Sequence, residues 1–355
     1  MRSALARLAL LVAAALLLLV PSTAAAAGSD NNSYVVHPLV SDTGAGGTIK
    51  DGNLVNAWGL TASGTSPWWV ADNGMNVSTL YNGNNPPSIV PLVVSVAGDG
   101  PTGTVFNSTP GFPLPAGTGN ARFLFDTEDG VISGWNGGSA SQPVITSKDG
   151  AVYKGLAIAN TSAGPRLYAT DFHNGRVDVF DGSWQPVKRP FAFFDPTIPR
   201  GFAPFGIQAI GSRIFVSYAK TQPGSDDEAH GPGLGFVDAF DAATGILTGK
   251  VLLGFQLNAP WGLAQAPDGF GAFGGDLLVG NFGDGHVNAF RPILGGIVYL
   301  PDGQLRDGSG QPVFIDGLWA LEFGNGGAAG PASSLFFTAG PDEESHGLFG
   351  SITAG

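Results

Sequence analysis

Residues Ala259–Phe290 read APWGLAQAPDGFGAFGGDLLVGNFGDGHVNAF, and this stretch contains the unit from which the rest of the chain is built. Its apolar runs PWGLA, DLLVGNF and HVNAF are short, and they are separated by glycine, proline, asparagine and aspartate. Short apolar runs between such turn-forming residues are typical of antiparallel strands joined by hairpins. Because one small sheet cannot bury both of its faces, we expect the unit to recur along the chain.

The first run of the unit does recur, as NAWGL, YKGLA, PFGIQ, PWGLA and LWALE. These runs align on a small residue, at Gly59, Gly155, Gly206, Gly262 and Ala320, with spacings of 96, 51, 56 and 58 residues. The first spacing is nearly double the others, so a degenerate sixth unit is expected inside it, and Asn120–Asn136 fits. Six units of about 50 residues have the length of propeller blades. The sequence therefore predicts an all-β, six-bladed β-propeller.

The N-terminal residues 1–27 have the pattern of a secretory signal peptide. Arg2 and Arg7 precede the apolar run Ala9–Val20, and small residues before position 28 offer cleavage sites. The run is shorter than the roughly 20 residues of a membrane-spanning helix, although a retained anchor is the alternative. We therefore expect a secreted, extracellular protein with one propeller domain, 28–355, and no membrane span after cleavage.

The composition narrows the class of function. The chain of 355 residues has no cysteine, which excludes thiol chemistry and disulfides, and together with the Ala/Leu-rich leader this favours a bacterial origin. Its formal net charge is −12, so its surface repels phosphate backbones and nucleic-acid binding is not expected. We expect a monomer that meets an extracellular small molecule, glycan or protein.

Three segments outside the repeats have predictable places. Tyr34–Val40 is expected to pair with strands near Leu335–Ile352 and so to close the ring, because closure removes a free sheet edge. The Gly/Pro/Thr-rich segment 98–119 is expected to be a long connection. Thr221–Gly235 is a polar insertion between the second and third strands of its unit, and it is either a functional loop or a plain surface loop.

In a propeller, the loops that enter the first strand and those that join the second to the third lie on one face. This face should collect many carboxylates and four of the five histidines. Aspartate and asparagine are also what tight turns require, whereas turn chemistry does not explain the histidines. The candidate catalytic residues are His173, His230 and His346. The candidate metal ligands are Asp171, His173 and His230, for Ca²⁺ or a transition metal. The candidate ligand-binding residues are Asn56, Asp171, Asn258, Asn281 and His286.

Aromatic residues also follow the repeat. Trp58, Trp261 and Trp319 stand directly before the aligned small residue in three of the units. Such rings either wedge between blades or form a stacking platform for a ligand.

The alternation of PWGLA, DLLVGNF and G-x-V-x-x-F resembles the NHL and gluconolactonase-like six-bladed propellers. From Tyr34 onward the chain also resembles an uncharacterised family of secreted bacterial propeller-like proteins, most clearly in NAWGLTASGTSPWWVADNG and APWGLAQAPDGFG. The gluconolactonase resemblance implies a metal held by a glutamate, an asparagine and an aspartate at the channel. Asn56 and Asn258 stand at first-strand entries, but no matching glutamate accompanies them.

Two functions therefore remain open, and the sequence does not decide whether the protein is an enzyme. The first is a secreted scaffold that binds a ligand or protein on its channel face. The second is a metal-dependent, lactonase-like hydrolase or lyase with a histidine and carboxylate site at the channel mouth.

Overall fold

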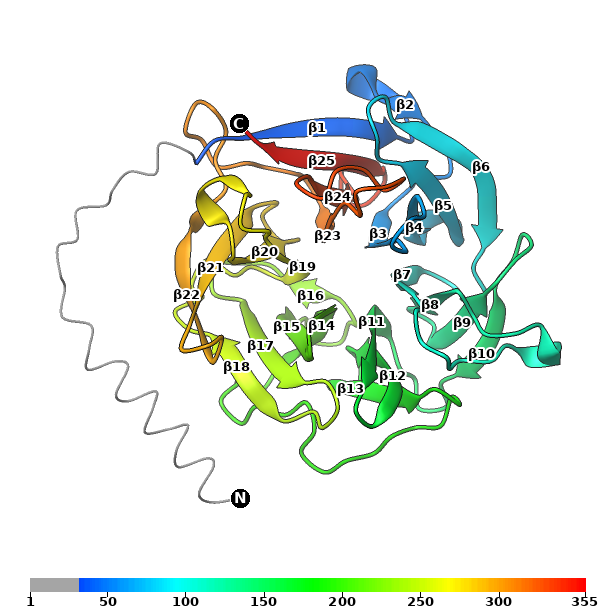
Figure 1. Cartoon of the computed structure of the whole chain (residues 1–355). Coiled ribbons are helices and arrows are strands. Elements are labelled where there is room, and N and C mark those ends of the chain that lie inside the picture. Colours follow the sequence, from blue (N-terminus) through cyan, green and yellow to red (C-terminus); the bar gives the residue numbers. More distant parts are fainter. Residues whose placement is uncertain (1–31) are drawn as a thin grey trace. The chain divides into compact units, whose positions relative to one another are not determined.

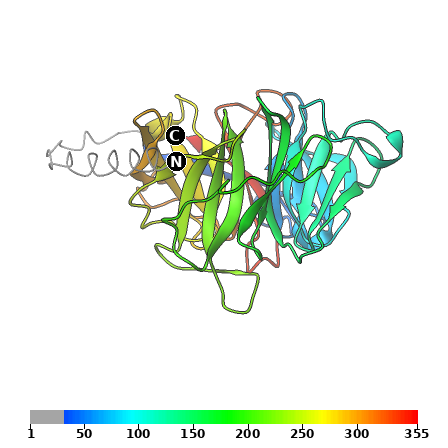
Figure 2. The same cartoon turned by 90° about the horizontal axis from the view of Figure 1, so that it is seen from below.

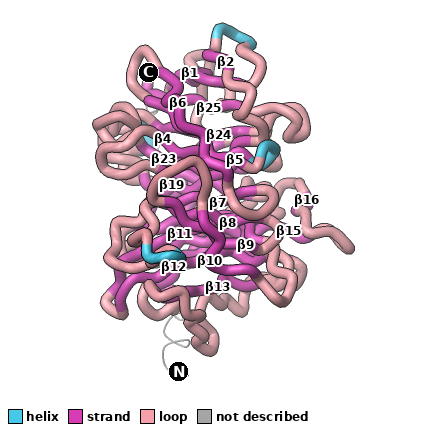
Figure 3. Tube along the Cα trace, turned by 90° about the vertical axis from the view of Figure 1, so that its right-hand side faces the viewer, coloured by secondary structure: helices cyan, strands magenta, loops and turns pink. Residues whose placement is uncertain are grey.

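The computed structural model describes residues 32–355, which form one compact unit. The predicted signal peptide lies outside the described residues. Strands and loops make up this unit, with only four short 3₁₀ helices (Figure 3). These helices are η1 (Ala45–Gly47), η2 (Asn73–Met75), η3 (Pro115–Gly117) and η4 (Gly271–Phe273). The all-β prediction is confirmed, and among the described residues no helix has the length and apolar character needed to cross a membrane.

The strands form antiparallel meanders that follow one another around a centre (Figure 1). The first two sheets contain β3 (Ala57–Thr61), β4 (Trp68–Asp72), β5 (Val77–Asn82) and β6 (Ser88–Ser95), then β7 (Pro101–Phe106), β8 (Phe123–Thr127), β9 (Val131–Trp135) and β10 (Gln142–Thr146). The third sheet contains β11 (Tyr153–Thr161), β12 (Gly164–Asp171) and β13 (Arg176–Asp181). The last sheet in the ring contains β23 (Leu318–Phe323), β24 (Leu335–Ala339), β25 (Leu348–Ala354), β1 (Tyr34–Ser41) and β2 (Ile49–Lys50).

The fifth sheet is larger and corrects the expectation of six separate blades. It joins two meanders, β14 (Phe202–Ile210), β15 (Arg213–Thr221), β17 (Gly235–Asp241) and β18 (Leu247–Val251), with β19 (Pro260–Gln265), β20 (Leu277–Asn281), β21 (Val287–Ile293) and β22 (Val298–Gln304); the short β16 (Glu228–Ala229) pairs with β15. The outer edge strands β18 and β22 pair in parallel, with Lys250 opposite Val298. Two outer edges that lie together satisfy each other's backbone groups, so four blades stand as separate sheets and two meanders merge.

The innermost strands surround the axis. Strands β3, β7, β11, β14, β19 and β23 contact one another in this order, and β23 returns to β3. A glycine in five of these six strands allows the close approach, because a Cβ at Gly206 would lie 2.1 Å from the carbonyl oxygen of Trp261 on the next strand. The first-strand runs found in the sequence are five of these six innermost strands, all except β7.

The second meander differs from the sequence prediction. Its innermost strand is β7, inside the segment expected to be a connection, whereas Asn120–Asn136 supplies the second and third strands, β8 and β9. The same packing rule applies here, because a Cβ at Gly103 would lie 2.3 Å from the backbone nitrogen of Leu156. Proline and threonine around this glycine conceal the strand in the sequence.

The N-terminal strand closes the ring as predicted. Strand β1 runs antiparallel to β25, from Tyr34 opposite Ala354 to Ser41 opposite Leu348 (Figure 1). Side-chain hydroxyls link neighbouring meanders as well. Thr170 Oγ1 donates to the carbonyl oxygen of Phe205 at 2.6 Å, and Ser217 Oγ donates to that of Pro260 at 2.5 Å.

The three repeated tryptophans meet at the axis. Trp58 stacks on Trp319 with ring centroids 3.6 Å apart, and Trp261 packs edge-on against both. All three belong to one buried core cluster. The three indole groups pack against one another inside the circle of innermost strands and fill the middle of the channel. The channel stays open at the end beyond them, where Trp58 lines a pocket.

Candidate functional site: a pocket at the mouth of the channel

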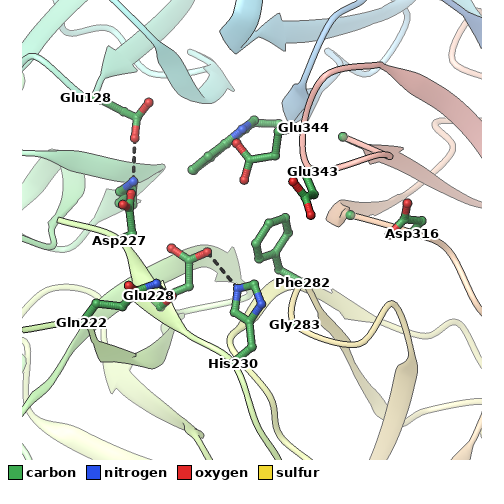
Figure 4. A pocket seen from close by; sticks show the side chains of 14 residues that line it. Glu128, Gln222, Asp227, Glu228, His230, Phe282, Gly283, Asp316, Glu343 and Glu344 are labelled. Atoms are coloured by element: carbon green, nitrogen blue, oxygen red, sulfur yellow. Dashed lines mark hydrogen bonds and ion pairs between the residues drawn. The ribbon is translucent and has the colours of Figure 1, made fainter. Parts of the chain in front are cut away.

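A pocket of about 490 Å³ opens at one end of the channel. Trp58 and Phe282 supply its aromatic floor, and Phe282 stacks on Trp319 with centroids 3.9 Å apart. Six acidic side chains line it against two basic ones, Lys154 and His230. Figure 4 shows Glu228, Glu343 and Glu344 near the ring of Phe282, with Glu128 farther along the pocket wall. The pocket therefore combines an apolar floor with a strongly acidic wall.

Lys154 is a buried cation in this wall. It lies on the innermost strand β11, and its side chain is only 3% exposed. Its Nζ lies 2.5 Å from Glu128 Oε1 and 5.3 Å from the ring centroid of Trp58. Burial lowers the pKa of Lys154, but the charge and hydrogen bond of Glu128 outweigh it, so that the pKa is raised. Lys154 therefore stays charged and holds Glu128 in place.

The predicted insertion supplies a second pair of groups. Thr221–Gly235 contains β16 and extends from one face of the ring (Figure 2), and Glu228 and His230 lie on it. His230 Nε2 lies 3.3 Å from Glu228 Oε1, and this contact raises the pKa of His230. Glu228 is buried, whereas His230 is half exposed to the pocket. A carboxylate that holds an imidazole can support proton transfer.

Glu344 enters the pocket from an unusual loop. Asp342, Glu343 and Glu344 have φ values of 54°, 53° and 65°, in the left-handed region that non-glycine residues rarely adopt. Asn56 Nδ2 donates to Glu344 Oε2 at 2.8 Å and anchors the side chain. Burial, with the charge of Glu228, raises the pKa of Glu344 to about 7. A carboxyl group that titrates near neutral pH in a cleft indicates a functional site.

The raised pKa of Glu344 predicts a pH-dependent stability difference. Between about pH 4.5 and 7, Glu344 keeps its proton in the folded protein but loses it in the unfolded chain. The free energy of unfolding of the parent protein therefore falls as the pH rises through this range. Glu344→Gln keeps an oxygen for Asn56 and cannot ionise. The difference in free energy of unfolding, variant minus parent, should therefore be about 1–2 kcal/mol larger at pH 8 than at pH 5, a value reduced because Glu344 is partly exposed. Chemical denaturation at both pH values measures this, and an equal difference at both would contradict it.

The histidines predicted as catalytic do not come together. His230 lines the pocket, whereas His173 pairs with Asp226 at 2.6 Å and His346 pairs with Asp42 at 2.7 Å. Asp171 is buried and binds Asn174 and Arg176 instead. Within residues 32–355, no three histidine, aspartate or glutamate side chains converge as a metal site would require, and this includes the predicted set Asp171, His173 and His230.

The amide residues predicted to bind a ligand support the loops at the channel mouth. Asn258 accepts from the Gly231 N–H at 2.6 Å and donates to Asp284, while Asn281 donates to Asp284 and to the carbonyl of Gln256. His286 Nδ1 contacts the carbonyl oxygen of Val313 at 2.8 Å. None of these three lines the pocket, and Asn56 contributes through Glu344.

The sequence analysis missed Lys154, Phe282 and Asp316. For Lys154 a signal was present, because four units have Trp58, Phe205, Trp261 or Trp319 at the position where this unit has lysine. A lysine in an aromatic position of a buried repeat needs a partner, since an unpaired charge is costly to bury. For Phe282 and Asp316 no comparable signal exists.

A closed all-β ring with a pocket at its channel mouth defines the chain as a β-propeller. No established sequence family matches it. It is 31% identical over 342 residues to the uncharacterized protein R648 of Acanthamoeba polyphaga mimivirus, covering 90% of this chain and 80% of that one. It is 28% identical to the uncharacterized protein L690 of the same virus, over 90% and 86% of the two chains. The chain therefore belongs to the same family as R648, and these relatives give no support to a bacterial origin.

Solved structures agree with the fold. A gluconolactonase from Xanthomonas campestris superposes with a TM-score of 0.50 at 13% identity, covering 85% of this chain and 87% of that one. At this identity the similarity shows the propeller fold and nothing about activity.

The metal site implied by the gluconolactonase resemblance does not fit these residues. Asn56 and Glu344 lie together, but the Asn56 amide group points its N–H to the carboxylate while its Oδ1 accepts from Trp319 Nε1 at 3.1 Å. An asparagine that ligates a metal offers its oxygen. These residues therefore do not form a metal site of that kind.

Proposed function

We propose that the protein binds a small organic cation in the pocket at the mouth of the channel. The observation that carries this proposal is the excess of carboxylates over an aromatic floor, six acidic side chains against two basic ones around Trp58 and Phe282. Lys154 already neutralises Glu128, and His230 neutralises Glu228 when it is protonated. Within residues 32–355, Asp227, Asp316 and Glu343 form no ion pair, so the pocket attracts a cation from solution.

The aromatic floor of the pocket, formed by Trp58 and Phe282, also favours an organic cation. One face of Phe282 stacks on Trp319, and Figure 4 shows acidic side chains near the ring. An ammonium group over an aromatic face gains about 0.5–2 kcal/mol, more as water is excluded. The volume of about 490 Å³ lies in the range of small-molecule sites.

A second candidate is acid–base catalysis on the bound molecule. The carboxyl of Glu344, with a pKa of about 7, lies in the same pocket as His230 held by Glu228. One such group can donate a proton while the other accepts one, as in hydrolases and lyases. An activity that follows a bell-shaped pH profile and disappears in Glu344→Gln would support this function.

Binding of probe amines tests the first candidate. Tetramethylammonium, putrescine and spermidine, titrated by calorimetry at pH 8 and low salt, should bind, whereas glycerol and glucose should not. Asp227→Asn and Glu343→Gln should each raise Kd about threefold to tenfold, and added salt should weaken binding. Asp268→Asn is the matched control, because it removes the same charge from an exposed loop residue outside the pocket and should leave Kd unchanged. Kd values for the two pocket variants equal to that of the parent protein would contradict the proposal.

We also propose that the merged sheet counts as two blades, which gives six, and that the mature protein is an exported monomer beginning near residue 28. The closed order of innermost strands supports the six blades, and the pattern of residues 1–27 supports export. N-terminal sequencing of protein from the medium of an expressing host tests the export. Recovery of only the uncleaved, cell-bound chain would contradict it.

A further inference from the structure

The third blade lacks an outer strand. Strands β11, β12 and β13 form a sheet of three, whereas the other sheets of the described ring have four or more. Beside β13, where a fourth strand would lie, is a groove of about 960 Å³. Its far walls are the end of β10 with the loop after it, and the long connection 182–201. The groove is separate from the pocket at the channel mouth, with which it shares no lining residue.

The outer edge of β13 is paired at its C-terminal end and free at its N-terminal end. At the paired end, the Val187 N–H donates to the carbonyl of Val179 at 2.7 Å, and the Asp181 N–H donates to the carbonyl of Gln185 at 2.9 Å. Backbone groups of alternate strand residues point to the same side, so those of Val177 face the groove as well. Within the described residues nothing pairs with the outer side of Val177. This half of the edge is ready to accept another strand.

The groove also carries positive charge on an acidic protein. Lys148, Lys188 and Arg189 line it, and none of them has an ion pair within residues 32–355. Arg176 differs, because Asp149 and Asp178 neutralise it. The chain as a whole has 28 acidic and 16 basic residues, so three free cations in one groove select for an acidic partner.

Apolar side chains lie between these charges. Ile145, Val177, Val179, Val187 and Phe193 line the groove and are partly buried. An added strand presents its side chains alternately to two sides. One set would meet these apolar residues while the other meets the lysines and arginine.

We propose that the edge of β13 binds an extended acidic peptide segment of a partner protein as a fourth strand of the third blade. Main-chain hydrogen bonds to Val177 supply the pairing, and Lys148, Lys188 and Arg189 supply the preference for glutamate and aspartate. The binding is independent of the pocket function.

Fluorescence anisotropy with a labelled heptapeptide that alternates glutamate and valine tests the proposal. The peptide should bind the protein, and the double variant Lys188→Glu with Arg189→Glu should raise Kd by at least about tenfold. The matched control, Lys50→Glu with Arg122→Glu, makes the same charge change at two exposed residues outside the groove and should change Kd less than threefold. Equal loss in both variants would overturn the proposal, because it would show a general effect of charge.

Two further peptides separate strand addition from simple attraction. The same glutamate–valine peptide with N-methylated alternate amides keeps its charge but loses donors, so it should not bind. A lysine–valine peptide should not bind either. Equal binding by either peptide would overturn the proposal. A protein dimer that the groove variant dissociates in light scattering would also overturn it, because the edge would then belong to a second copy.

Discussion

Deletion of β1 is expected to prevent the protein from folding, or to lower its melting temperature by at least about 15 °C. The strand supplies the outer partner of β25 along its whole length and covers an edge that would otherwise be free. Its Tyr34 and Val40 are 1% and 0% exposed, so their burial is lost as well. The comparison is between a chain that begins at residue 32 and one that begins at residue 42, each followed by circular dichroism on heating. Similar melting of the two chains would contradict the closure.

Single substitutions in β1 isolate the packing contribution. Tyr34 contacts the rings of Phe270 and Phe273, and its hydroxyl donates to the carbonyl of Phe270 at 3.2 Å. Tyr34→Ala should therefore cost about 3–5 kcal/mol in the free energy of unfolding. Val35 is the next residue of the strand and is 46% exposed, so Val35→Ala should cost below about 0.5 kcal/mol.

The second large effect is expected at the ion pair between Lys154 and Glu128. Glu128→Gln leaves the Lys154 ammonium, 3% exposed, without its nearest carboxylate, and should cost about 3 kcal/mol at pH 7. Lys154→Met should cost less, because Glu128 is 33% exposed and water can solvate it. The larger loss of stability in Glu128→Gln than in Lys154→Met follows from the deeper burial of Lys154.

The double variant Glu128→Gln with Lys154→Met is the control. It removes both charges, so its stability should lie above that of Glu128→Gln alone. Urea denaturation of the four proteins at pH 7 measures the cycle. Additive losses, or a larger loss in Lys154→Met than in Glu128→Gln, would contradict the account of this pair.

The sequence was sufficient to find the ring and its closure. The repeated small residue, glycine in four strands and Ala320 in the fifth, reports the close approach of innermost strands, and it located five of them. It failed for β7, where Gly103 lies between threonines in a segment that reads as a loop. It also could not show that β18 and β22 pair, because the spatial proximity of two outer edges leaves no local pattern.

The site was predictable only in part. The polar face and the insertion were found, and they supply Glu128, Glu228, His230 and Glu344 to the pocket. Which histidine reaches the pocket depends on loop conformation: His173 pairs with Asp226, and His346 pairs with Asp42 and lies within 4.0 Å of Asp342. The burial that raises the pKa of Glu344 arises from packing between distant parts of the chain, so no local signal could indicate it.

The central claim is that the channel-mouth pocket holds an organic cation, and a crystal structure with the tightest-binding probe amine tests it most directly. The account predicts density for the ammonium group within about 6 Å of the Phe282 ring centroid, with the carboxylate of Glu343 or Glu344 beside it. An amine bound elsewhere, with this pocket containing only water, would contradict the claim.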